Sequence, residues 1–332
     1  MPSMQHSWSM PDAAGLATAA AMPIGRPSVG SAQSTIGRHF LIALGFSMLL
    51  LAALMHAAQL RIDPFLPSNR PFYAVFMAAA ALRFGLPRTR WRHALPVAHF
   101  SLYVGLFMLI SLMGAAASYP VAALTHGYAD PLLQRIDEAL GFDWLAWYRL
   151  AADSPTLQFA GTVAYRSIYV TPALLLWNFA RAGHYDRAWR FMASFWLAAV
   201  ITLILFSLMP AVGPFSYLWH EPIRYMPESE LWQSGLIPAL RAHSVHIVDL
   251  GQLRGIVSAP SFHTAAAMLY IVAGWHMAAL RWPIVALNAA MLLSTPVEGT
   301  HYLIDMILGV GVALTALALI RAYVAMLDRR TA

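Results

Sequence analysis

Long apolar segments recur along most of this chain and constrain its fold more than any other feature. Each segment approaches the roughly 20 residues that a helix needs to cross the hydrocarbon core of a bilayer. A bilayer core offers no water to unpaired backbone groups, so such segments predict helices. We expect about eight membrane-spanning helices, at residues 39–60, 71–87, 95–118, 159–180, 190–210, 262–280, 283–299 and 302–325.

The composition agrees with a membrane protein. Apolar residues make up 59% of the 332 residues and charged residues 11%, far from the values of a soluble domain. The expected fold is therefore all-α, a single polytopic membrane helical bundle over residues 38–327, with no room for a large soluble domain. The chain has no cysteine, which excludes disulfides, thiol catalysis and cysteine-ligated metals.

The distribution of basic residues predicts the topology. The formal net charge is +6, and the basic residues are all arginines that gather at the ends of apolar segments. They do not form a dense run with interleaved aromatic residues, so we expect the lipid bilayer as a partner, and no nucleic acid. The positive-inside rule favours N-in/C-in, with both termini in the cytoplasm. Richness in alanine and arginine suggests a bacterial protein, and hence the inner membrane.

Three segments outside the expected spans have their own character. Residues 1–37 are rich in small residues and proline, with charges only at Asp12 and Arg26, and we expect a disordered cytoplasmic tail. Residues 129–150 have helical periodicity and predict amphipathic surface helices, with Trp144, Trp147 and Tyr148 as membrane-interface anchors. Residues 211–259 begin with helix breakers and predict a lid or wall over a site at residue 260.

The candidate site combines two short motifs. Pro260-Ser261-Phe262-His263-Thr264 starts one apolar segment, and His301-Tyr302-Leu303-Ile304-Asp305 starts another. Proline and serine favour a helix start, whose free amides attract phosphate. His301 and Asp305 are four residues apart and share a helical face, so the carboxylate can orient the imidazole for attack. His126 and Asp130 have the same spacing, but we expect them in a solvated interfacial loop.

These motifs resemble a known family. Pro260–Thr264 and Ser294-x6-His301-x3-Asp305 are similar to the second and third motifs of the type 2 phosphatidic acid phosphatase superfamily, over roughly the last 75 residues. The Phe-His-Thr and His-Tyr-x2-Asp variants look most like the inositol phosphorylceramide synthase-like, or inositolphosphotransferase-like, branch. The resemblance implies that His301 is the nucleophile, that Asp305 orients it and that His263 is the general acid and base. It also implies phosphate binding by Ser261 and Phe262, and no metal or organic cofactor.

The chain departs from the family pattern where phosphate-binding cations are expected. Thr295 stands where the phosphatases have arginine, and the lysine-arginine motif of the preceding span has no counterpart near residues 208–211. We expect Arg166 and Arg254 to bind phosphate in their place, since developing charge must be balanced. The alternatives are a salt bridge from Arg166 to Glu298 or Asp305, and an interfacial headgroup contact for Arg254.

The expected function is transfer of a phosphorylated headgroup between lipids, or from a lipid to a polar acceptor, at the periplasmic face. Fewer cations suit a phosphodiester, which has one negative charge fewer than a phosphomonoester. One alternative is a phosphatase acting on phosphatidic acid or a polyprenyl pyrophosphate. Another is a non-catalytic lipid-binding or transport protein. The sequence leaves the lipid, the acceptor and the oligomeric state open.

Overall fold

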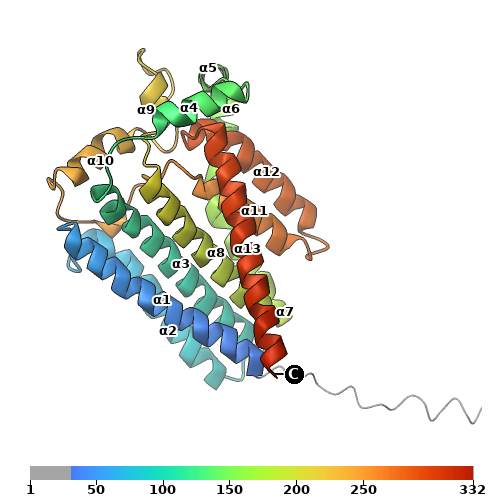
Figure 1. Ribbon diagram of the computed structural model, residues 1–332. Coiled ribbons are helices and arrows are strands. Elements are labelled where there is room, and N and C mark those ends of the chain that lie inside the picture. Colours follow the sequence, from blue (N-terminus) through green and yellow to red (C-terminus); the bar gives the residue numbers. More distant parts are fainter. Residues whose placement is uncertain (1–30, 332) are drawn as a thin grey trace, which may run out of the picture.

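The computed structural model describes residues 31–331, and the side chains of residues 35–329, as an assembly of helices (Figure 1). This confirms the all-α prediction. The α-helices are α1 (Ser31–Ala57), α2 (Arg70–Gly85), α3 (Ala94–Ala123), α4 (Asp130–Ala139), α5 (Trp144–Ala152), α6 (Pro155–Arg166), α7 (Val170–Ala182), α8 (Tyr185–Leu208), α9 (Pro214–Leu218), α10 (Trp232–Arg241), α11 (Phe262–Gly274), α12 (Arg281–Glu298) and α13 (Leu303–Thr331).

Within the described residues, four helices are long and apolar enough to cross a membrane on their own: α1, α3, α8 and α13. They correspond to the predicted spans 39–60, 95–118, 190–210 and 302–325. The chain is an integral membrane protein with a polytopic helical bundle, as predicted.

Of the other four predicted spans, 283–299 corresponds to the continuous helix α12, and the remaining three are shorter than predicted or interrupted. α2 covers span 71–87 with 16 residues, and span 159–180 is divided into α6 and α7 by a 3-10 turn at Ser167–Tyr169. Span 262–280 was predicted too long, because α11 ends at Gly274 and the chain then turns into α12. Thirteen residues make α11 about 20 Å long, against about 30 Å for the hydrocarbon core. α11 and α12 thus form a short hairpin at one end of the bundle.

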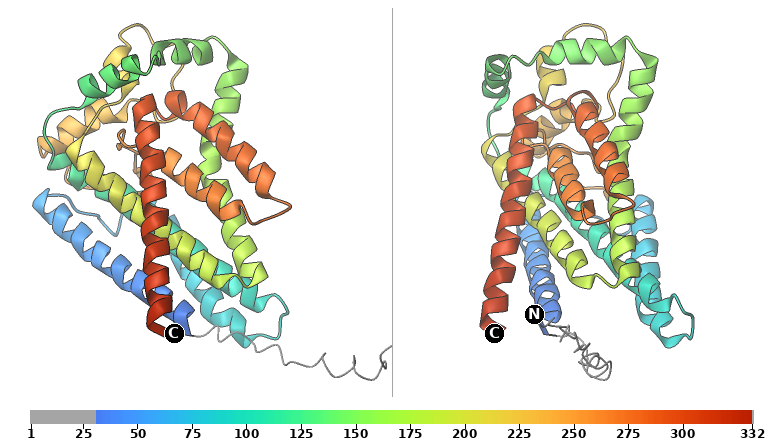
Figure 2. Two further views of the ribbon diagram at one scale, coloured as in Figure 1. Left: turned by 45° about the vertical axis from the view of Figure 1, so that its right-hand side comes forward. Right: turned by 90° about the vertical axis from the view of Figure 1, so that its right-hand side faces the viewer.

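The two ends of the described chain lie at the same end of the bundle. α1 begins and α13 ends there, whereas α4, α5 and α9 lie at the opposite end (Figures 1 and 2). This arrangement fits the even number of crossings that N-in/C-in requires. α1 already begins at Ser31, inside the segment predicted as a tail, and residues 1–30 of that segment lie outside the described residues.

The core of the bundle surrounds α8. Buried side chains from α3, α7, α8, α11 and α13 form one cluster, with ring contacts such as that between Phe195 and Tyr270. α13 packs against α8 and α11, and α12 packs against α11 and α6. Gly309 permits the close approach of α13 to α11, since a Cβ there would lie 2.9 Å from Cβ of Thr264 and closer still to the carbonyl oxygen of Ser261. The fold therefore brings the starts of α11 and α13 together.

The surface helices predicted over residues 129–150 are present as α4 and α5, but two of the three expected membrane anchors are not at the surface. Trp144 is 2% exposed and Tyr148 is fully buried, whereas Trp147 is 37% exposed. Trp144 and Tyr148 pack against Phe215, and the indole nitrogen of Trp144 donates to the carbonyl oxygen of Pro296 at 2.7 Å. They face the protein because the loop after α8 folds back over α5 and covers their rings.

Candidate active site

The start of α11 is tied directly to the second motif. Ser261 is fully buried, and its hydroxyl oxygen accepts from the amide of Thr264 at 3.4 Å, as expected for a serine N-cap. The amide of Ser261 donates to the backbone carbonyl oxygen of Asp305 at 2.9 Å. A backbone hydrogen bond therefore fixes the 260–264 motif against the first turn of α13.

The predicted His301 and Asp305 pair is assembled at the start of α13. Nδ1 of His301 lies 3.6 Å from Oδ2 of Asp305, and both side chains are buried. The same Oδ2 accepts from the amide of Tyr302 at 3.0 Å. Within the described part of the chain, Nδ1 of His301 and Oδ1 of Asp305 have no hydrogen-bond partner. The Asp305 carboxylate thus lies beside Nδ1 of His301, and Nε2 is the ring nitrogen away from it.

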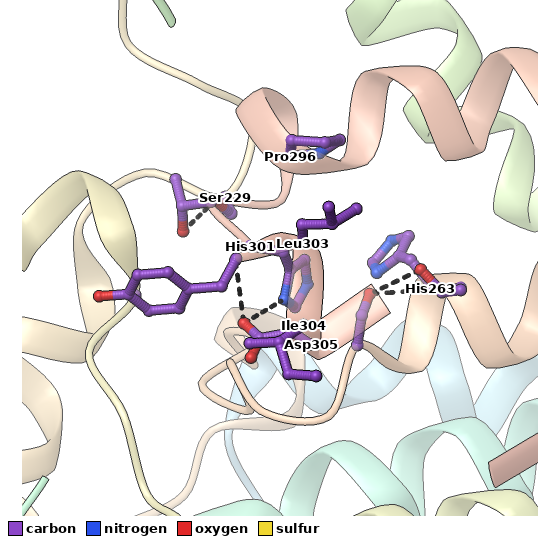
Figure 3. Close-up of polar contacts among 12 residues, drawn as sticks. Ser229, His263, Pro296, His301, Leu303, Ile304 and Asp305 are labelled. Carbon is purple, nitrogen blue, oxygen red and sulfur yellow. Dashed lines mark hydrogen bonds and ion pairs between the residues drawn. The ribbon is translucent and has the colours of Figure 1, made fainter. Parts of the chain in front are cut away.

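His263 completes the predicted group. In Figure 3 the imidazole rings of His263 and His301 face one another, and Asp305 lies on the far side of His301. His263 belongs to α11, whereas His301 lies in the turn before α13. A phosphorus atom held between them would have one imidazole on the side of attack and the other near the departing oxygen. That is the arrangement expected for nucleophilic attack combined with general acid catalysis.

Tyr165, on α6, is a neighbour of both histidines that the sequence did not single out. Its ring stacks on the His263 imidazole, with centroids 4.0 Å apart and planes inclined by 14°. Its hydroxyl lies 3.2 Å from Nδ1 of His263. A Cβ on Gly299 would lie 3.1 Å from Cε2 of Tyr165 and 2.6 Å from Cδ2 of His301, so both side chains pack against that glycine. No short motif marks Tyr165, because its partners are about 100 residues away.

Two aspartates of α4 hold the start of α13 in place. The Asp137 carboxylate accepts from the amides of Leu303 at 2.7 Å and Ile304 at 2.9 Å. Asp130 accepts from the amides of Val212 and Gly213 and from the hydroxyl of Tyr302. Burial raises the pKa of both carboxyl groups, and the bonded amides oppose that shift. Asp130 is 1% exposed, so the expectation of a solvated loop was wrong for this residue.

A loop over residues 219–231, here called the lid loop, is bound to the end of α12. Glu298, 1% exposed, accepts from the Tyr225 hydroxyl at 2.7 Å and from the amide of Glu228 at 3.1 Å. The amide of Ser229 donates to the carbonyl oxygen of Glu298 at 2.9 Å, and its hydroxyl lies 3.3 Å from that of Thr300. Burial raises the pKa of Tyr225 to about 12, so its hydroxyl keeps the proton that it donates. The lid loop thus contacts the residues immediately before His301, in the region predicted as a lid or wall.

The two candidate arginines have carboxylate partners. Nε of Arg166 lies 2.7 Å from Oε1 of Glu228 in the lid loop, and the Arg166 side chain is 63% exposed. This partner is neither Glu298 nor Asp305, the two alternatives that we considered. Arg254 lies 3.9 Å from Glu230, with its guanidinium 4.2 Å from the centroid of Trp232. Arg166 adjoins Tyr165 in sequence, whereas the contacts of Arg254 are with the lid loop and α10.

Phe262 and Thr295 use their side chains for packing and helix bonding. The Phe262 ring contacts Phe195 edge-on, with centroids 5.2 Å apart, so its backbone amide is the part available to phosphate. The Thr295 hydroxyl donates to the carbonyl oxygen of Met291 at 2.7 Å. Among the described residues, no group of three or more His, Asp or Glu side chains is placed to hold a metal ion.

The comparison with known families covers the residues that form this site. The family model of the PAP2 superfamily matches residues 131–319, which is more than half of the chain. The chain belongs to the PAP2 superfamily. It is therefore a phosphatase or phosphotransferase of the type 2 phosphatidic acid phosphatase kind. The match includes α4, the lid loop, both histidine motifs and most of α13. No curated protein and no solved structure matches the chain.

Proposed function

We propose that this PAP2 superfamily protein transfers a phosphorylated headgroup from a membrane lipid to an acceptor through a phosphohistidine at His301. The observation that carries the proposal is the buried His301 and Asp305 pair, with the His263 ring facing it (Figure 3). Within the superfamily, we propose that the chain belongs to the inositol phosphorylceramide synthase-like branch.

The reaction has two balanced steps. In the first, Nε2 of His301 attacks phosphorus, the bond to the leaving oxygen breaks, and that oxygen takes a proton from His263. In the second, an acceptor hydroxyl gives its proton to His263 as its oxygen attacks phosphorus and the bond to His301 breaks. Asp305 stabilises the imidazolium that His301 becomes while it carries the phosphoryl group. Amides in the first turn of α11 are the proposed donors to the phosphate oxygens.

The charges around the site support a phosphodiester donor over a phosphomonoester. Arg166 is paired with Glu228 and Arg254 faces Glu230, so each arginine brings a carboxylate with it. The buried Glu298 adds another acidic group three residues before His301. A substrate with a single negative charge meets less repulsion here than one with two. This favours headgroup transfer, with phosphatase action on phosphatidic acid or a polyprenyl pyrophosphate as the alternative.

The proposed location is the bacterial inner membrane, with the site facing the periplasm. The histidine motifs lie toward the end of the bundle opposite the start of α1 and the end of α13 (Figure 2). If the arginine bias places those termini in the cytoplasm, the site opens on the other face.

Trapping of a phosphoenzyme tests the mechanism. Purified protein incubated with a lipid labelled at phosphorus should acquire an acid-labile, base-stable label, which His301→Ala abolishes together with activity by orders of magnitude. The matched control is His126→Ala, because His126 has the same spacing to an aspartate but is exposed. Equal activity in wild type and His301→Ala would leave a non-catalytic lipid-binding protein as the better description.

Analysis of the reaction products identifies the acceptor. Exchange of a labelled headgroup between two lipids supports the transferase, whereas release of inorganic phosphate from phosphatidic acid without exchange supports the phosphatase. Inositol, choline and glycerol esters tested in parallel would show which headgroup the site accepts.

A further inference from the structure

Tyr165, which is buried, and His263, which is half-buried, form a pair supplied by two different helices. The ring of Tyr165 is 8% exposed, on α6, and that of His263 lies over it from α11. The hydroxyl is 3.2 Å from Nδ1, the imidazole nitrogen on the side of the tyrosine. Gly299 places the same tyrosine against His301. Stacking and the polar contact together restrict the imidazole to one orientation.

We propose that Tyr165 is the positioning residue of His263: its stacked ring and its hydroxyl beside Nδ1 fix the imidazole, so that Nε2 is the nitrogen that exchanges the proton with the reacting oxygens. The inference rests on the proposed phosphohistidine mechanism and adds a residue to it. An imidazole whose Nδ1 were free could adopt the other tautomer, with its proton on the wrong nitrogen for base catalysis.

The two histidines then differ by their partners. His301 adjoins a carboxylate, which stabilises the positive charge that the nitrogen acquires when it binds phosphorus. His263 adjoins a neutral hydroxyl, which orients the ring without holding a proton on it. A neutral partner suits a group that gives up its proton in one step and takes up a proton in the next. The neighbours thus assign nucleophile and proton carrier independently of the order of the motifs.

In atomic terms, Nδ1 of His263 keeps its proton and its contact with the Tyr165 hydroxyl through both steps. Nε2–H passes to the leaving oxygen as the phosphorus bond to that oxygen breaks and the bond to His301 forms. Nε2 then receives the proton of the acceptor hydroxyl as the acceptor bond to phosphorus forms. Tyr165 neither gains nor loses a proton overall.

Presteady-state kinetics with p-nitrophenyl octyl phosphate test this role. Nitrophenolate leaves without protonation, so its burst reports phosphoenzyme formation, whereas steady-state release reports transfer to water or added octanol, which needs His263 as base. Tyr165→Phe keeps the ring and removes the hydroxyl. We expect a burst rate within about threefold of wild type and a steady state slowed about tenfold or more. In the pH–rate profile of Tyr165→Phe, the limb that reports the pKa of the general base should also shift.

Tyr270→Phe is the matched control. Tyr270 is a fully buried tyrosine of α11 whose hydroxyl donates to the carbonyl oxygen of Ile168 at 3.2 Å, outside the proposed chemistry. It should leave both phases and the pH profile unchanged. The burst amplitude counts folded sites, which separates misfolding from slow chemistry.

Three results would overturn the inference. Tyr165→Phe could match Tyr270→Phe in the steady state, or could slow burst and steady state by the same factor, which would indicate a structural role. A wild type without any His301-dependent burst or turnover would overturn the proposed function itself, and this inference with it. Tyr165→Leu, which also removes the stacked ring, should slow the steady state more than Tyr165→Phe does, and an equal steady state in the two variants would contradict a role of the ring in orientation.

Discussion

The pair of Arg166 and Glu228 shows how individual residues set the charge beside the histidines. The two side chains meet at 2.7 Å, but Arg166 is 63% exposed, and exposed ion pairs contribute little to stability. Arg166 can therefore exchange Glu228 for a phosphate oxygen at small cost. The same residue follows Tyr165, which contacts His263. An arginine in this position can balance charge at the site only when the lid-loop glutamate releases it.

Substitutions of this pair should affect substrate binding in opposite directions. Arg166→Gln should raise KM for the phosphorylated donor about tenfold with a smaller change in kcat, since a hydrogen bond to a charged group contributes about 1.5–3 kcal/mol. Glu228→Gln should lower KM. The control is Arg224→Gln, which removes another exposed pair, with Asp153 at 2.7 Å. Steady-state kinetics with the donor measure all three, and an Arg166→Gln KM equal to that of the control would exclude phosphate binding by Arg166.

At the scale of helices, the site depends on how closely α13 approaches the start of α11. Two contacts hold them together: the hydrogen bond from Ser261 to the Asp305 carbonyl and the packing of Thr264 against Gly309. Asp137 of α4 then fixes the first turn of α13 through two amides. The residues that make these contacts do no chemistry, yet they decide whether His263 faces His301.

Glycine substitutions in α13 test this contact. Gly309→Ala would place a Cβ 2.9 Å from Cβ of Thr264 and against the Ser261 carbonyl, so the helices must separate. We expect at least a tenfold loss of kcat and a lower melting temperature in detergent, as overpacking costs about 1–3 kcal/mol.

Gly311→Ala is the matched control on the same helix, because a Cβ there meets nothing within 4 Å. It should leave kcat unchanged and raise stability by about 0.5–1 kcal/mol. Equal behaviour of the two variants would contradict the importance of the close approach.

For the whole molecule, the decisive property is which end faces the periplasm. α4 lies at one end of the bundle and the turn after α7 at the other (Figure 1). The absence of cysteine in the chain allows single-cysteine labelling without background. Ala139 and Ala182 are the last residues of α4 and α7, and both are exposed.

The two alanines provide a matched test of orientation. In intact cells a membrane-impermeant maleimide should label Ala139→Cys at once, and Ala182→Cys only after permeabilisation. Gel-shift of the labelled protein measures both. The reverse pattern would place His263 and His301 on the cytoplasmic side and would contradict N-in/C-in.

The class of fold and the proximity of His301 and Asp305 could be predicted because their signals are local. Apolar segments of the length of α1, α3, α8 and α13 have few alternatives to spanning a bilayer. The spacing of His301 and Asp305 brings them together, although His301 lies in the turn before α13 rather than on the helical face that was expected. Segment 262–280 was predicted too long because an apolar sequence does not show that α12 turns back against α11 at Gly274.

The surroundings of the histidines depend on contacts between distant parts of the chain. Trp144 and Tyr148 are residue types that commonly anchor proteins at the membrane interface, but Phe215 packs over their rings. Asp130 lies in a segment that resembles a surface loop in sequence, but its carboxylate accepts hydrogen bonds from two amides of the loop after α8. A local pattern cannot indicate which of two amphipathic surfaces will be covered, since the free energy of burial depends on the partner.

The sequence by itself determined that this is a helical membrane protein with a histidine pair and an aspartate at the starts of two helices. The periodicity, the span lengths and the i, i+4 spacing are properties of single segments, and elementary physics limits what they can form. The tertiary structure alone decided the partners: Tyr165 for His263, Asp137 for the start of α13, and Glu228 for Arg166. Each of these joins helices or loops far apart in the chain, and only the packing of the bundle specifies which polar groups meet.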